Sequence, residues 1–160
     1  MLELSQREVD LIRTLRKDAV LKDVDTEKFN PSQLVMIVCG DGHRLPKIMD
    51  YHARLARSHA LAPDQECLHT FAFNGGALLL ACQSSLVPPN ANVDTFLRGQ
   101  IERTIEMKGL ARDGRPTVVF STHAPCGAAR TTNMSVLQQI TTLALAKSRH
   151  KAIEAGTDVS

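Results

Sequence analysis

Apolar residues gather in three short runs along the chain. They lie at residues 34–39 (LVMIVC), 68–73 (LHTFAF) and 117–121 (TVVFS). The first and third runs are almost uninterrupted, which is typical of strands that are covered on both faces of a parallel sheet. The pattern therefore predicts three strands, with the first and third deeply buried.

Between these runs, apolar residues recur at helical spacing. The signals that bound the helices are a capping box at Ser5 and Glu8, a first-turn proline at Pro46, a capping Asn92, a terminating Gly109 and a last helical pattern over residues 131–151. Helices and strands thus alternate along the chain. This alternation predicts an α/β fold in which a mostly parallel central sheet is flanked by helices in Rossmann-like layers.

The length of 160 residues suits one domain. We expect residues 1–30 to form an amino-terminal helical arm and residues 152–160 a flexible tail. The least regular internal segment is 82–91 (CQSSLVPPNA), which is expected to form a loop on the surface or over a site.

Composition excludes several classes of partner. Hydrophobic residues make up 43% of the chain, charged residues 22%, and the net charge is +2 without a dense basic run, so neither disorder nor binding to nucleic acid or an acidic membrane surface is expected. The longest apolar run, at 77–82, is far shorter than the roughly 20 residues that span a bilayer. With no export signal visible and four scattered cysteines, we expect a cytoplasmic protein with reduced thiols.

Polar residues that can bind metals follow the first and third strands, at 39–44 (CGDGHR) and 122–127 (THAPCG). Because ligands gather at the carboxyl ends of parallel strands, Cys39, His123 and Cys126 can converge there. Two thiolates and one imidazole form a Cys₂His zinc set with a fourth position open to water or substrate. The alternative is that the cysteines are small buried residues and the histidine belongs to the core.

The ordered set Cys39-x-Asp41, Phe73-Asn-Gly-Gly76 and His123-x-x-Cys126-Gly-Ala resembles the β-class carbonic anhydrases. The resemblance covers roughly residues 34–130 and implies that Cys39, His123 and Cys126 bind Zn²⁺. It also implies the family reaction, the reversible hydration of carbon dioxide to bicarbonate and a proton. Dimers or larger homo-oligomers, in which the amino-terminal helix reaches across to a partner, are implied as well.

Two departures from the family pattern affect the expected site. The family arginine stands two positions after the aspartate, where this chain has His43, and Arg44 follows one residue later. In the family that arginine holds the aspartate off the metal, so we expect Arg44 or His43 to pair with Asp41. A paired Asp41 accepts a hydrogen bond from the zinc-bound water, whereas an unpaired Asp41 can close the metal site as a fourth ligand. The second departure is Asn-Gly-Gly-Ala at 74–77, where the family has Asn-Ala-Gly-Asn.

The sequence therefore predicts a carbonic anhydrase-like zinc lyase that acts on carbon dioxide through a metal-bound hydroxide, with Asp41, His43 and Arg44 as its catalytic residues. Two alternatives keep the zinc site: a hydrolase of carbonyl sulfide or carbon disulfide, and a non-catalytic zinc-binding relative closed by Asp41. A thiol-redox protein is less favoured because no Cys-x-x-Cys is present. The other histidines, Cys67 and Cys82 are expected to have structural or surface roles.

Overall fold

The three predicted strands form one parallel sheet in the computed structural model, which describes residues 3–23, 25, 33–59, 67–81, 84–88, 90–111 and 116–154. The strands are β1 (Gln33–Cys39), β2 (Cys67–Phe73) and β3 (Thr117–Phe120). Their order in the sheet is β2-β1-β3, so β1 lies between the other two. The predicted α/β fold with a parallel sheet flanked by helices is confirmed.

Strand β1 forms the centre of the core, and all seven of its residues are buried. Successive side chains point to opposite faces of a sheet, so the strand supplies two apolar clusters. Val35 and Ile37 belong to the cluster on one face, and Leu34, Met36 and Val38 belong to the cluster on the other. This double burial explains why the sequence of β1 is apolar throughout rather than alternating.

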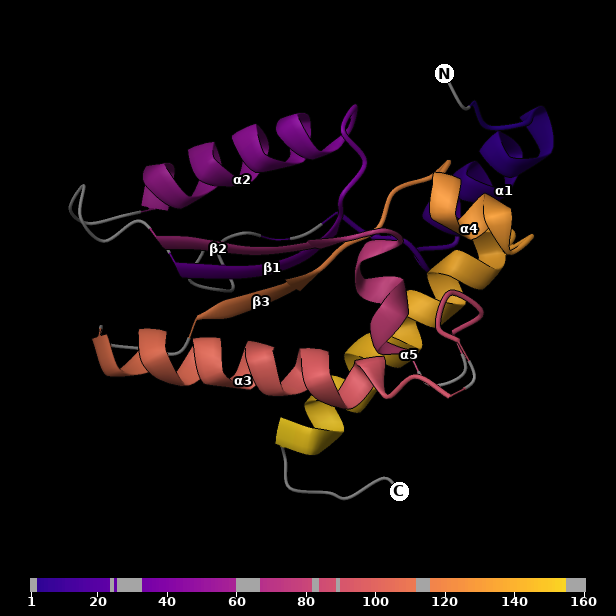
Figure 1. Ribbon diagram of the computed structural model, residues 1–160. Helices are drawn as coiled ribbons and strands as arrows, with labels where there is room; N and C mark the ends of the chain where they lie inside the picture. The colour runs from indigo at the N-terminus through magenta and orange to yellow at the C-terminus, as the bar shows by residue number, and fades with distance from the viewer. Residues whose placement is uncertain are drawn as a thin grey trace.

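Helices cover both faces of the sheet (Figure 1). On one face lies α2 (Leu45–His59), whose Ala56 packs against the β1 cluster. On the other face lie α3 (Val93–Ala111) and α5 (Val136–Glu154), which contribute Ile101 and Ala146 to the core. Within the described ranges, no helix combines the length and the apolar character that a membrane crossing requires.

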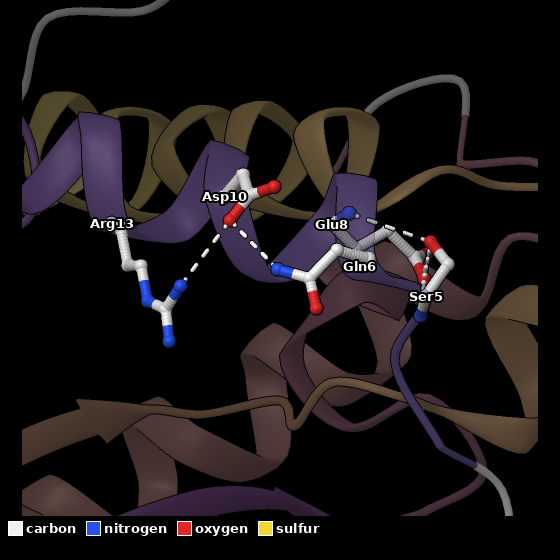
Figure 2. Close-up of polar contacts among 5 residues, drawn as sticks. All are labelled: Ser5, Gln6, Glu8, Asp10 and Arg13. Carbon is white, nitrogen blue, oxygen red and sulfur yellow. Dashed lines mark hydrogen bonds and ion pairs between the residues drawn. The ribbon is translucent and has the colours of Figure 1, made fainter.

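The amino-terminal helix α1 (Gln6–Lys17) begins with the predicted capping box (Figure 2). The Ser5 hydroxyl accepts a hydrogen bond from the Glu8 backbone N–H at 3.4 Å, and the Glu8 carboxylate accepts one from the Ser5 N–H at 2.8 Å. Asp10 accepts further hydrogen bonds from Gln6 and Arg13. No residue of α1 is buried, although its apolar residues share one side. The helix is therefore well capped but weakly packed against the rest of the chain.

Three predicted boundaries differ from the structure. Helix α3 continues through Gly109 to Ala111, because a glycine ends a helix only where it takes up a left-handed conformation, which Gly109 does not adopt. The last helix, expected from about residue 131, begins at Val136 as α5; it follows a separate short helix, α4 (Gly127–Thr131), and a turn in which Asn133 has a φ of 54°. Helix α5 extends to Glu154, into the segment expected to be a tail. Some expectations fall outside the described residues. They concern residues 113–115, the tail from 155 to 160, Cys82 and the side chain of Cys67.

Candidate metal centre

The sheet brings the three predicted metal ligands together. Cys39 is the last residue of β1, and His123 and Cys126 follow β3, whose residues pair with β1 in parallel register from Leu34 opposite Thr117. Parallel pairing places the carboxyl ends of both strands at the same edge. The Sγ atoms of Cys39 and Cys126 and a ring nitrogen of His123 all lie within 4.8 Å of one another.

The geometry of this group fits zinc. Two sulfurs at about 2.3 Å from a tetrahedral zinc ion are about 3.8 Å apart, and the Cys39 and Cys126 Sγ atoms are 3.9 Å apart. Both cysteines are free thiols and are buried. Both ring nitrogens of His123 are buried without a hydrogen-bond partner among the described residues, which is costly unless another group, such as a metal, binds one of them. The donor set and its spacing are compatible with Zn²⁺, although such a set can also bind other soft metal ions.

The two thiols differ in acidity. A hydrogen bond between the sulfurs lowers the pKa of Cys126 to about 5 and raises the pKa of Cys39 above its usual value. The backbone N–H groups of Ala129 and Ala128, in the first turn of α4, further favour the Cys126 thiolate. One sulfur of the pair is therefore already in the form that binds metals at neutral pH.

The 3₁₀ helix η3 (Gly76–Leu80) fixes the strand ends that carry the ligands. Gly76 has a φ of 59°, and a Cβ atom at this position would lie 2.4 Å from the Ser121 carbonyl oxygen and 2.6 Å from the Cys39 backbone nitrogen. The next residue, Ala77, donates its N–H to the same Ser121 oxygen at 3.1 Å. This glycine thus permits the turn to pack directly on both strand ends. The sequence indicated the segment 74–77 through the family resemblance, but the close packing around Gly76 is visible only in three dimensions.

Asp41 lies beside the three ligands and is held by backbone groups. Its Oδ1 atom accepts hydrogen bonds from the N–H groups of His43 at 2.8 Å and Arg44 at 3.2 Å. These bonds, that of His43 foremost, lower the pKa of the Asp41 carboxyl. The Oδ2 atom faces His123 and is 3.6 Å from its Nε2 atom. Asp41 does not belong to the group whose ligand atoms all lie within 4.8 Å of one another, but it lies directly beside that group.

The two side chains that were expected to pair with Asp41 do not bind its carboxylate. Among the described residues, neither the Arg44 guanidinium nor the His43 imidazole makes a hydrogen bond or ion pair with the Asp41 carboxylate, and only their backbone N–H groups bind it. The His43 side chain is exposed. Backbone N–H groups at the start of α2 thus occupy the place that the resemblance gives to an arginine side chain.

A cavity of about 460 Å³ opens beside the candidate metal site. Its walls come from four parts of the chain and are formed by Cys39, Asp41, Asn74, Leu86, Gly127, Ala128, Thr131 and Thr132. Leu86 belongs to the segment 82–91, so the described part of that loop does reach the site. The described lining includes the Asp41 carboxylate and no lysine, arginine or histidine. It therefore offers no cation to hold an anionic substrate.

The remaining histidines within the described ranges lie outside the metal-ligand group. His52 and His59 each contact a backbone carbonyl one turn earlier in α2, at 2.8 Å and 3.0 Å. The ring of His69 lies against Phe71, and the buried ring of His150 lies 5.1 Å from that of Phe120. These contacts support structural roles for all four.

We compared the chain with protein-family models, with curated proteins and with solved structures, and none of the three comparisons found a match.

Proposed function

We propose that this chain is a zinc-dependent carbonic anhydrase-like enzyme that catalyses the reversible hydration of carbon dioxide to bicarbonate. The observation that carries the proposal is the convergence of Cys39, His123 and Cys126 beside a cavity whose wall includes Cys39 and Asp41. Zinc held by these three residues would lower the pKa of a bound water and so supply a hydroxide nucleophile near neutral pH.

The Asp41 carboxylate would accept a hydrogen bond from that nucleophile. Its Oδ1 atom is already occupied by two backbone N–H groups, which leaves Oδ2 to accept a hydrogen bond on the side of His123. Its lowered pKa keeps the carboxyl ionised at neutral pH, as this role requires. The carboxylate would thereby orient the nucleophile toward the cavity.

The charge of the cavity supports a neutral substrate. The residues described in the cavity wall carry one carboxylate and no cationic side chain, so they do not attract anions from solution. Carbon dioxide is neutral and small enough for the space, and the bicarbonate product would not be retained by an opposing positive wall. The same reasoning admits carbonyl sulfide or carbon disulfide as neutral linear alternatives.

Metal analysis and stopped-flow assays test the proposal together. Purified protein should contain about one zinc per chain and hydrate carbon dioxide, and Cys39→Ser or His123→Ala should remove both properties. His59→Ala is the matched control because His59 is an exposed histidine on α2 that should change neither.

Three results would contradict the proposal or redirect it. A folded chain that binds no zinc would exclude it. Zinc-loaded protein that is inactive between pH 6 and 9 would favour the non-catalytic relative closed by Asp41. Faster turnover of carbonyl sulfide or carbon disulfide than of carbon dioxide would favour the hydrolase.

We further propose that the enzyme is a homodimer or larger homo-oligomer and works in a reducing compartment such as the cytoplasm. Helix α1 buries none of its residues fully, and Val9, Ile12 and Leu15 on its apolar side are half-buried, so part of that side is left for a second copy. Free thiols at Cys39 and Cys126 must stay reduced to bind zinc. Sedimentation analysis should find an oligomer that Ile12→Lys dissociates, and a wild-type monomer would contradict the assembly.

A further inference from the structure

We propose that the side-chain amide of Asn74 binds the substrate, donating a hydrogen bond to an oxygen of carbon dioxide as it becomes bicarbonate. This inference rests on the proposed function and adds to it the group that positions the substrate opposite Asp41. Asn74 lines the same cavity as Cys39 and Asp41.

Among the described residues that line the cavity, Asn74 carries the side-chain amide or hydroxyl that makes no hydrogen bond within the described part of the chain. The other two candidates are Thr131 and Thr132, whose hydroxyls donate to the backbone carbonyls of Ala128 at 2.7 Å and Ala129 at 3.1 Å. The Asn74 amide makes no hydrogen bond with the described part of the chain, although it lies beside a buried candidate metal site. Its donor is therefore available to a ligand in the cavity.

The backbone around Asn74 is firmly placed. Asn74 directly follows Phe73, which is the register partner of Cys39, and the Phe73 carbonyl accepts the Gly40 N–H at 2.9 Å. Gly75, the next residue, has a φ of 88° and packs so closely on Leu86 that a Cβ atom would lie 2.4 Å from its Cδ1 atom. The amide is thus presented from a turn that is fixed to the same strand end as the metal ligand.

A neutral donor suits the charge change of the reaction. Negative charge develops on the oxygens of carbon dioxide as the carbon is attacked, and an N–H donor beside them stabilises that charge. Because the amide carries no charge, it does not hold bicarbonate as a guanidinium or ammonium group would. Asn74 therefore provides a neutral donor for substrate oxygen in a cavity where the described ionised side chain, Asp41, is an acceptor.

The experiment compares Asn74→Ala and Asn74→Asp with the wild-type protein, all loaded with zinc. Both variants should retain about one zinc per chain and the wild-type melting temperature, because Asn74 is exposed and makes no hydrogen bond with the described residues. We expect kcat/KM for hydration to fall about 10- to 100-fold in Asn74→Ala, and further in Asn74→Asp, whose carboxylate repels the product. Titration calorimetry should show bicarbonate affinity falling in the same order.

Asn90→Asp is the matched control, since Asn90 is an exposed asparagine that does not line the cavity and receives the same charge change. It should leave both hydration and bicarbonate affinity unchanged. If Asn74→Ala retains wild-type hydration and bicarbonate affinity, the inference is wrong while the proposed function stands. If wild-type protein binds bicarbonate without hydrating carbon dioxide, the function fails, and the calorimetric ranking still tests the role of Asn74. Wild-type protein that does neither would overturn both.

Discussion

Asp41 uses its two carboxylate oxygens for two different partners. Oδ1 accepts the N–H groups of His43 and Arg44, in the turn that leads into α2, and Oδ2 faces His123. The first contact is typical of a residue that caps a helix, whereas the second places a negative charge beside the candidate metal. One side chain therefore connects the stability of α2 to the chemistry of the site.

Asparagine and alanine at position 41 should separate these roles. Asp41→Asn keeps an oxygen that can accept the N–H groups of His43 and Arg44 but removes the negative charge, so kcat should fall about 100-fold while the melting temperature stays near that of the wild type. Asp41→Ala removes both contacts and should lower both quantities. Thermal unfolding and stopped-flow assays measure them, and equal melting temperatures for the two variants would contradict the capping role.

Arg44 should be dispensable for holding Asp41. Its guanidinium makes no ion pair with Asp41, and its backbone N–H persists in any substitution other than proline. Arg44→Gln should therefore change kcat/KM by less than about twofold. If the guanidinium formed an ion pair with Asp41, its removal would instead shift the pKa of that carboxyl and lower kcat/KM strongly. A loss of activity in Arg44→Gln comparable to that in Asp41→Asn would show that the guanidinium contributes after all.

From the sequence, the candidate metal-binding side chains could be predicted, but the backbone hydrogen bonds at the site could not. Cys39, His123 and Cys126 could be predicted because their residue types bind zinc and their positions follow two buried strands. The anchor of Asp41 could not be predicted, because every residue except proline has the N–H that makes it. The availability of Asn74 likewise depends on where the hydroxyls of Thr131 and Thr132 donate, which residue types do not reveal.

At the level of elements, the junction between β2 and η3 depends on Gly76. Gly76→Ala would place a methyl group against the Ser121 oxygen and the Cys39 nitrogen at a φ of 59°. We expect a loss of about 3 kcal/mol or more in the free energy of unfolding, together with weaker zinc binding. Denaturant titration and metal analysis of the same samples measure these losses.

Gly99→Ala is the control for Gly76→Ala, because the same substitution should here raise the free energy of unfolding. Gly99 lies within α3, and a Cβ atom there would meet nothing within 4 Å. Alanine favours the helix over glycine, so this variant should gain about 0.5–1 kcal/mol. A similar loss for both variants would contradict the packing argument for Gly76.

Strands were predicted more accurately than helix ends. The apolar run of β1 could be identified because the strand is buried on both faces, so nearly every residue carries the signal. The start of α5 was placed too early because Met134, which is buried in the turn before Val136, fits the helical spacing of the apolar residues that follow. Hydrophobic periodicity reports which face is buried, and it does not report where the backbone leaves the helix.

At the level of the whole molecule, zinc should stabilise the fold that forms its site. A ligand that binds the folded chain at 100 times its Kd adds about 2.7 kcal/mol to the free energy of unfolding. For a chain of this size that gain corresponds to a rise of about 5–10 °C in Tm. Differential scanning calorimetry with zinc and with a chelator measures the shift, and Cys39→Ser should abolish it. An equal shift in Cys39→Ser would place the ion elsewhere.

The two sulfurs of the site are 87 positions apart, and α2, β2, η3, α3 and β3 lie between them. A nascent chain that has not yet reached β3 carries only Cys39 of the three ligands, whatever else it has folded. Contacts of such long range form late, because the intervening chain must first be ordered. Metal uptake would therefore follow completion of the sheet during synthesis, and a truncated or misassembled chain would be left without its ion.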